Sequence, residues 1–162
     1  MVIKKRKYQF QIDEEDLPKI QGYNLNIFLA GRPSGVKRWR VQAVRYLGKK
    51  VVESISLSRL IMRLNKEDKR VIDHINHDGL DNRKGNLRIC SRQQNNQNSR
   101  KGSNNTSGYK GVCKIKDSYR AEIGFNNKHI YIGKFRLPEE AALAYNKKAI
   151  ELHGGFAVLN QV

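Results

Sequence analysis

Two structural devices are missing from this sequence: a disulfide framework and a cysteine-based metal site. The chain has two cysteines, Cys90 and Cys113, which lie far apart, and two thiols do not make a network of bridges. Neither belongs to a CxxC pair or to a Cys/His spacing typical of zinc, so no zinc is expected. We interpret both as reduced thiols of a cytoplasmic protein.

Long apolar runs are also missing. No stretch of the sequence is apolar enough to span a bilayer, and the expected helices lack the basic amphipathic pattern of membrane-surface binders. The charged N-terminal stretch MVIKKRKYQFQIDEED is not followed by an apolar region, so no signal peptide is expected. We therefore expect no membrane partner.

Acidic residues are scarce. The 162 residues contain 15 Asp and Glu against 32 Lys and Arg, which gives a formal net charge of +17. Basic residues outnumber acidic ones in each of the segments 1–72, 73–106 and 107–162. Because Lys and Arg that neutralise phosphates release condensed counterions, this charge predicts a nucleic acid partner. Charge alone does not distinguish DNA from RNA.

The first third of the chain has the pattern of extended structure. Apolar and polar residues alternate around Trp39, Val41 and Ala43, which predicts a half-buried strand. We expect a hairpin over 36–57 with one basic face. The period then changes over 56–64, where four residues share one helical face: Leu57, Leu60, Ile61 and Leu64.

Residues 69–100 predict a ββα unit. A short strand over 69–73, a polar loop over 75–85 and a second strand over 86–90 precede a helix that begins at Ser91. Asp73 and His74 lie at the end of the first strand, and Asn95 lies one turn inside the helix. If the helix packs over the hairpin, Asn95 faces Asp73.

The chemistry of this cluster is specific. A carboxylate and an amide carbonyl are hard oxygen donors that suit Mg²⁺ or Mn²⁺. A neutral histidine beside them is able to take a proton from water near neutral pH. With basic surroundings, these are the components of phosphodiester hydrolysis.

Each of these residues also has a structural interpretation. A single His74 is ordinarily a buried or exposed structural histidine, Asp73 and Asn86 are common turn residues, and Asn95 fits an exposed helix position. None of these explains the joint spacing, which favours a site. The structural interpretation is preferred for His77.

The run DHINHDGLDNRKGNLRICSRQQN resembles the HNH nuclease motif in the form found in homing endonucleases and their phage relatives. The resemblance implies that His74 is the general base and that Asn86 fixes its orientation through a hydrogen bond. It also implies that Asp73 and Asn95 hold the divalent metal. Arg83 and Arg88 stand at two recurrent basic positions of this form. Each is a candidate phosphate contact, and a solvent-exposed charge without such a contact is an equally open interpretation.

The C-terminal part follows a polar linker over 99–107. Three strands are expected over 109–116, 118–125 and 128–135, with a tight turn at Asn126-Asn127 between the last two. A helix begins at Pro138 and stops before Gly154. Alternation directs Tyr119, Ala121 and Ile123 toward this helix and leaves the opposite sheet face free.

Tyr-Lys-Gly-Val, Ala-Glu-Ile, Tyr-Ile-Gly-Lys-Phe and Glu-Glu-Ala-Ala-x-Ala-Tyr within 107–160 resemble an AP2/ERF-type DNA-binding domain. The resemblance implies that the three-stranded sheet enters the major groove. Cys113 and Ile115 stand where plant members place arginines, so base-reading capacity is reduced. The candidate DNA contacts of the sheet are Lys110, Arg120, His129 and Tyr131.

The expected fold class is α+β: a basic, β-rich N-terminal segment leads into a ββα-metal unit, and an AP2-like sheet with one helix follows. We expect an HNH domain over 1–98, a linker over 99–107 and an AP2-like domain over 108–162. The function expected is metal-dependent hydrolysis of double-stranded DNA, leaving 5′-phosphate and 3′-hydroxyl ends. The preferred setting, implied by resemblance, is a homing or phage-related role.

One active site per chain predicts nicking by a monomer or weak dimer. The alternatives are a noncatalytic AP2-like regulator and, less favoured, an RNA-acting protein.

Overall fold

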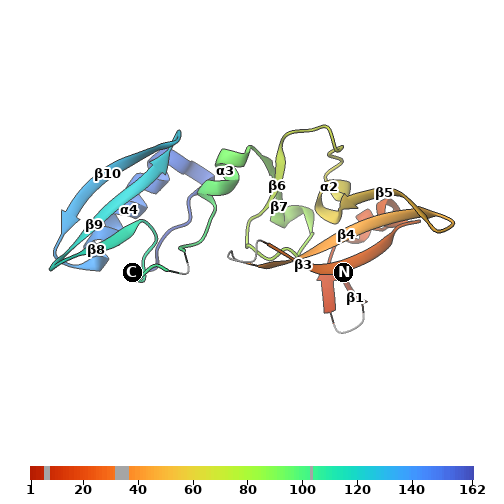
Figure 1. Ribbon diagram of the computed structural model, residues 1–162, viewed down its shortest axis with the longest axis horizontal. Helices are drawn as coiled ribbons and strands as arrows, with labels where there is room; N and C mark the ends of the chain where they lie inside the picture. The colour runs from red at the N-terminus through yellow and green to blue at the C-terminus, as the bar shows by residue number, and fades with distance from the viewer. Residues whose placement is uncertain (6–7, 32–36, 103) are drawn as a thin grey trace. The chain divides into compact units, whose positions relative to one another are not determined.

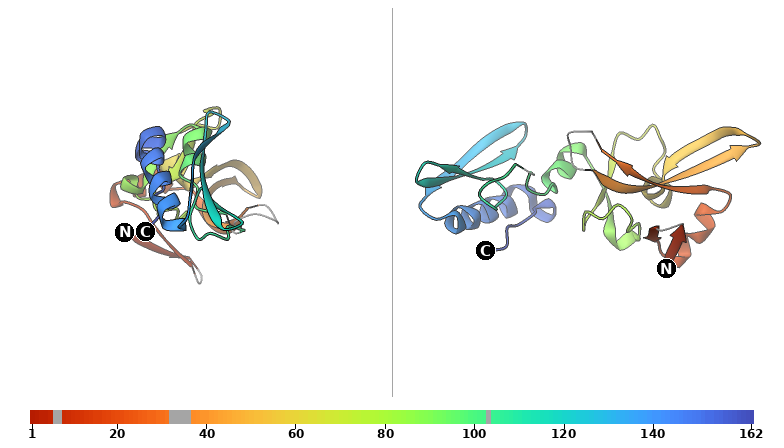
Figure 2. Two further views of the ribbon diagram at one scale, coloured as in Figure 1. Left: turned by 90° about the vertical axis from the view of Figure 1, so that its left-hand side faces the viewer. Right: turned by 60° about the horizontal axis from the view of Figure 1, so that its bottom comes forward.

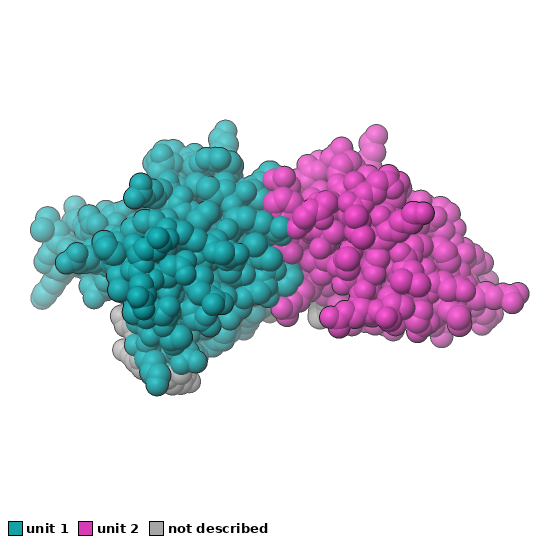
Figure 3. Space-filling model, turned by 180° about the vertical axis from the view of Figure 1, so that it is seen from behind, with its two compact units in different colours: residues 1–91 teal, residues 92–162 magenta. Residues whose placement is uncertain are grey.

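The chain is an α+β protein made of four small antiparallel sheets and short helices. The computed structural model describes residues 1–5, 8–31, 37–102 and 104–162. Contacts divide the chain into two compact units, Met1–Ser91 and Arg92–Val162, which Figure 3 colours separately. By its contacts the short helix after Ser91 belongs to the second unit, and the domain limits of 1–98, 99–107 and 108–162 stay a prediction.

The first unit is built on a hairpin and a three-stranded antiparallel sheet of order β3-β4-β5 (Figure 1). A two-stranded sheet, β6-β7, completes it. The strands are β1 (Val2–Lys5), β2 (Tyr8–Gln11), β3 (Asn24–Ala30), β4 (Arg38–Leu47), β5 (Lys50–Ser56), β6 (Val71–His74) and β7 (Leu87–Cys90). The helical segments are η1 (Glu14–Asp16), α1 (Leu17–Ile20), α2 (Leu57–Ile61) and η2 (Lys84–Asn86).

The core of the first unit lies where the sequence pattern places it. Val41 and Ala43 of β4 are buried, and Leu57 and Ile61 of α2 join them in one cluster. The cluster extends to Leu87 of β7, so the strand pair that carries the candidate site is anchored on the core. The expected hairpin is confirmed as β4 paired with β5, although residue 36 lies outside the described residues.

The second unit is a three-stranded antiparallel sheet of order β10-β9-β8 covered by one long helix. Figure 2 shows the helix α4 against one face of this sheet, with the other face uncovered. The elements are α3 (Arg92–Gln97), β8 (Val112–Ile115), β9 (Ser118–Phe125), β10 (Lys128–Phe135), α4 (Pro138–His153) and η3 (Gly154–Phe156).

Local sequence explains this second unit well. Asn126 and Asn127 have φ of 50° and 59°, as the tight turn of a hairpin requires. Ala121 and Ile123 are buried against α4, as the alternation predicts. No described helix of the chain is long and apolar enough to cross a membrane.

Candidate active site

Asp73 and His74 close strand β6 and are both buried. Antiparallel pairing with β7 places Asp73 opposite Arg88 and His74 opposite Leu87. Each of the two residues is 5% exposed. Because burial of a polar group without a partner is costly, the partners of these two residues define what the site does.

Arg88 holds the carboxylate of Asp73. Its Nε and Nη2 both lie 2.8 Å from Oδ2 of Asp73. This charge-assisted pair supplies the buried carboxylate with a hydrogen-bonded counter-charge. Arg88 is half-buried, so its contact with a DNA phosphate stays a prediction, and its observed partner is the proposed metal ligand.

Asn82 holds the ring of His74. Oδ1 of Asn82 lies 3.3 Å from Nε2 of His74, while Nδ2 of Asn82 donates to the carbonyl oxygen of Gly79 at 3.4 Å. With the amide in this orientation, Nε2 of His74 is the donor. The lone pair of the neutral ring is then on Nδ1, which makes Nδ1 the basic atom of the residue.

The surroundings of His74 favour this neutral form. Burial lowers the pKa of His74 below its ordinary value of 6.5, and the positive charge of Arg40 lowers it further. The hydrogen bond to Asn82 and the charge of Asp73 act in the opposite direction. A histidine with a lowered pKa is unprotonated at neutral pH, as a general base must be.

Arg40 and Asn82 are residues of the site that the motif alone does not identify. Arg40 belongs to β4, far from the motif in sequence. The sequence predicted a basic face for this strand but did not link Arg40 to His74. Asn82 is 1% exposed but stands in a polar loop, where burial has no sequence signal. Gly79 contacts the same strand: a Cβ there would lie 2.0 Å from Nη1 of Arg40 and 2.2 Å from the carbonyl oxygen of Trp39.

Asn86 binds the loop that follows His74. Its Oδ1 accepts from the amide of Asn76 at 3.0 Å, and its Nδ2 donates to the carbonyl of Asp81 at 2.8 Å. Its backbone oxygen also accepts from the amide of Ile75 at 2.9 Å. These bonds fix the two residues after His74, so Asn86 acts on the backbone next to the histidine, and a direct bond to its ring stays a prediction.

Arg83 is tied to the same loop. Its Nε and Nη2 each lie 2.8 Å from an oxygen of Asp81, and this pairing lowers the pKa of the buried Asp81 carboxyl. The guanidinium remains half exposed. A phosphate contact of Arg83 stays a prediction.

The N-terminal segment of the chain closes the other side of the loop. The amide of Gln11 donates to the carbonyl of Leu80, and the amide of Asn82 donates to the carbonyl of Gln11, both at 2.8 Å. The amide of Lys84 donates to Oδ2 of Asp13 at 2.7 Å. Residues 80–84 are thus hydrogen-bonded to a segment about 70 residues away.

One cluster of three acidic side chains exists among the described residues, and two lysine ammonium groups pair with it. Asp13, Glu15 and Asp16 offer oxygens within 4.8 Å of one another. Asp16 is fully buried, with Lys19 at 2.7 Å and Lys84 at 3.2 Å from its Oδ1. We interpret the cluster as the counter-charge that holds Lys84 and the loop, because ammonium groups occupy the position a cation would take.

The donors at the end of β6 fit a hard divalent ion in chemistry. Asp73 supplies carboxylate oxygen, the ligand type that Mg²⁺ and Mn²⁺ prefer, although an ion there has to share the carboxylate with Arg88. The second predicted ligand, Asn95, is half-buried on α3, which belongs to the other compact unit. The pairing of Asn95 with Asp73 stays a prediction.

The outer face of the second sheet carries most of the predicted DNA contacts. His129 and Tyr131 are exposed at this surface, and Tyr131 is 63% exposed. Arg120 is on the same face, with Nε 3.2 Å from Oε2 of Glu122. Lys110 lies before β8, half-buried, and its Nζ donates to the carbonyl of Gln97 at 2.7 Å, so this lysine is directed away from the outer face.

Comparison with known proteins supports both halves of this description. Residues 66–97 match the family model of the HNH endonucleases. The chain is 39% identical over 92 residues to an uncharacterized HNH endonuclease, L560, of Acanthamoeba polyphaga mimivirus, covering 56% of the chain and 47% of that protein.

Two plant proteins match a shorter stretch. The ethylene-responsive transcription factor WRI1 of Arabidopsis thaliana is 44% identical over 62 residues, which cover 36% of the chain and 14% of that protein. The AP2-like ethylene-responsive transcription factor At1g16060 of the same plant is 45% identical over 62 residues, covering 36% of the chain and 18% of that protein.

The chain therefore spans about half the length of the viral relative and less than a fifth of each plant factor. No solved structure gives a significant match. The strand pair with Asp73 and His74 lies inside the matched HNH segment. The chain thus carries an HNH endonuclease motif and, in its C-terminal part, similarity to the AP2-type transcription factors.

Proposed function

We propose that this protein is a divalent-metal-dependent endonuclease that nicks double-stranded DNA. The observation that carries the proposal is a buried histidine, held neutral beside a buried carboxylate, within the segment that matches the HNH family model. The positive charge of the chain supplies attraction for the phosphate backbone.

His74 is the general base of the proposed reaction. Its Nδ1 takes a proton from a water molecule, whose oxygen forms a bond to the phosphorus atom while the bond from phosphorus to the 3′ oxygen breaks. The products are a 5′-phosphate and a 3′-hydroxyl, whose proton comes from solvent. Asn82 and Asn86 keep the ring and the following backbone in place, which contributes by orientation.

Asp73 is a ligand of the proposed metal, and Asn95 is its predicted companion. These two residues would hold the ion, and when bound it would supply positive charge to offset the negative charge that develops during cleavage. Arg88 orients the carboxylate of Asp73 through its hydrogen bonds, and Arg40 adds positive charge near His74. These arginines are positioning residues in the proposal.

The C-terminal sheet places the enzyme on DNA. Its outer face presents His129, Tyr131 and Arg120, with Arg120 paired to Glu122. A single base-reading arginine engaged by a carboxylate predicts weak sequence discrimination. With one site per chain, the expected product is a nick; a dimer or two successive events would be needed for a double-strand break.

The test is nicking of supercoiled plasmid by the purified full chain, with Mg²⁺, Mn²⁺ or EDTA. His74→Ala should lower the nicking rate by about 10²–10⁴-fold, because the general base is lost, while DNA binding in EDTA persists. His77→Asn is the matched control: this histidine lies three residues away with φ of 66°, a conformation that Asn tolerates.

The competing function is a noncatalytic DNA-binding protein, favoured by the similarity to plant transcription factors. Binding without nicking by the wild type, in both metals, would support this alternative and overturn the nuclease. Preferential cleavage of RNA under the same conditions would overturn DNA as the substrate. The homing or phage-related setting stays a prediction.

A further inference from the structure

A cavity of about 640 Å³ lies in the second unit, and none of the proposed catalytic residues of β6 is among its described lining residues. Its walls come from α3, the segment before β8, the β9–β10 turn and the last turn of α4. The lining residues of α3 are Arg92, Gln93, Asn96 and Gln97. Their spacing places them on one face of the helix, and Asn95 lies on the other.

The charge of the cavity has one sign. Arg92, Lys110 and Lys128 line it, and none of its described lining residues is an aspartate or glutamate. Burial lowers the pKa of Lys110 to about 8, and its ammonium donates to the carbonyl of Gln97 at 2.7 Å. A buried amine without a carboxylate counter-charge favours an anionic ligand.

His153 contributes a polar atom that is buried and has no partner. The residue is 7% exposed, and its Nε2 lies 3.1 Å from the carbonyl oxygen of Gly124. Because a carbonyl only accepts, Nε2 carries the proton and Nδ1 of the neutral ring is an acceptor. Nδ1 finds no hydrogen-bond partner among the described residues, so this residue of the cavity lining has an acceptor left for an N–H or O–H group.

Part of the cavity lining is apolar and aromatic. Ile123, Phe125 and Tyr145 line it, and the ring of Tyr145 packs so closely on Gly111 that a Cβ there would lie 2.2 Å from the ring. The Tyr145 hydroxyl has no hydrogen bond within the described part of the second unit. Aromatic surface beside polar groups is the environment in which nucleic acid bases bind.

We propose that this cavity is a nucleotide-binding site. The phosphate lies against Arg92, Lys110 and Lys128, and an N–H of the attached base donates to Nδ1 of His153. Two sources present this chemistry, a free mononucleotide and an unpaired nucleotide of a bound DNA strand. The unpaired DNA nucleotide as a source rests on the DNA binding proposed above. It would lie on one face of α3, whose other face carries Asn95.

The experiment uses the full chain carrying His74→Ala, in EDTA, so that cleavage plays no part. The probes are 2′-deoxyadenosine 5′-monophosphate, inorganic phosphate and a single-stranded oligonucleotide, followed by NMR of ¹⁵N-labelled histidine side chains. Either nucleotide probe should shift the Nδ1 signal of His153. Inorganic phosphate should compete with the mononucleotide but leave this signal unshifted, because it lacks the base.

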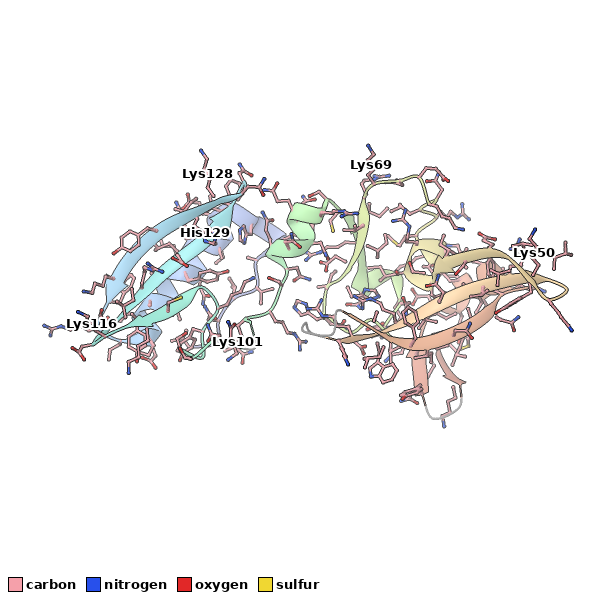
Figure 4. The ribbon with its side chains drawn as sticks, in the orientation of Figure 1. Lys50, Lys69, Lys101, Lys116, Lys128 and His129 are labelled. Carbon is pink, nitrogen blue, oxygen red and sulfur yellow. The ribbon has the colours of Figure 1, made fainter. Side chains whose placement is uncertain are left out.

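The charge contribution is tested with Arg92→Gln/Lys128→Gln. This double variant should lower the salt slope of oligonucleotide binding by about 0.7, the value for one lost single-strand phosphate contact. Lys116→Gln/Lys147→Gln removes the same charge from exposed positions outside the cavity and should leave the slope unchanged. Figure 4 places Lys116 and Lys128 at opposite ends of the sheet.

Three results would overturn the proposal: no shift of His153 with either nucleotide probe, an equal shift with inorganic phosphate, or equal slopes for the two double variants. A shift with the mononucleotide supports a free-nucleotide site, and a shift with the oligonucleotide alone assigns the site to a DNA strand. Plasmid nicking by the wild type is a separate measurement, so failure of this site and failure of the proposed nuclease are distinguishable.

Discussion

Gly79 is the position at which one methyl group should do the most damage to the candidate site. It lies in the loop after β6, directly against β4. A Cβ would lie 2.2 Å from the backbone oxygen of Trp39 and 2.0 Å from Nη1 of Arg40, whereas ordinary contacts begin at 3.4 Å. The arginine tip is flexible and able to move, but the carbonyl belongs to the central strand of the sheet and has little freedom.

Gly79→Ala therefore forces the loop and the strand apart by more than about 1 Å, and overpacking of this kind costs about 1–3 kcal/mol. For a unit of this size, about 2 kcal/mol corresponds to a fall in Tm of roughly 10 °C. The carbonyl of Gly79 also accepts from Asn82, which holds His74. A displacement of about 1 Å in such a support should slow nicking by about 10²-fold.

Gly85→Ala is the matched control in the same loop, because a Cβ at Gly85 meets nothing within 4 Å. Urea unfolding and plasmid nicking should be measured on both variants. Gly85→Ala should resemble the wild type in both assays. Equal stability and equal nicking rates for the two variants would refute the close packing of the loop on β4.

Other expectations follow from the partners of His74 and Asp73. The nicking rate should decline as pH falls through the lowered pKa of His74. Arg40→Gln should move this decline to higher pH, because it removes the positive charge that lowers the pKa of His74. A pH–rate profile of the wild type and of the variant checks both expectations. Because the pKa of His74 is lower in the folded chain than in the unfolded chain, the unfolded chain binds more protons as pH falls. The free energy of unfolding should therefore fall as pH drops below about 6.5. His74→Gln should make the free energy of unfolding, measured in urea titrations, less dependent on pH. Arg88→Leu should destabilise the first unit by about 3 kcal/mol, since it leaves the Asp73 carboxylate buried without its guanidinium; Asp73→Asn in the same background should restore most of the loss.

Local patterns in the sequence predict most of the fold. The alternation around Val41 identifies β4, the Asn126-Asn127 pair identifies the last hairpin, and the Ala121/Ile123 spacing identifies the face under α4. Each of these features depends on neighbours in the chain, whose periodicity reflects one buried face. The strand pair around His74 is likewise short-range, and its loop closes on itself through Asn86.

The partners of the site residues are less predictable because they depend on long-range packing. Arg40 reaches the surroundings of His74 through the placement of β4 against the loop, and Asn82 becomes buried through its bond to Gln11. Lys110 illustrates the limit of local patterns: the strand expected over 109–116 includes it, but the strand begins only at Val112. Its amine instead contacts the carbonyl of Gln97.

The segment that matches the HNH family cannot by itself account for the fixed position of His74, the proposed general base. Residues 66–97 contribute a two-stranded sheet, and an isolated pair of strands is marginally stable in water. No cysteine pair of a zinc staple is present. What holds the loop is supplied by the N-terminal segment: the Gln11 bonds, the Asp13 contact to Lys84 and the floor formed by Trp39 and Arg40. The β-rich N-terminal segment therefore holds this loop in place, and its removal should cost the proposed activity through loss of order around His74.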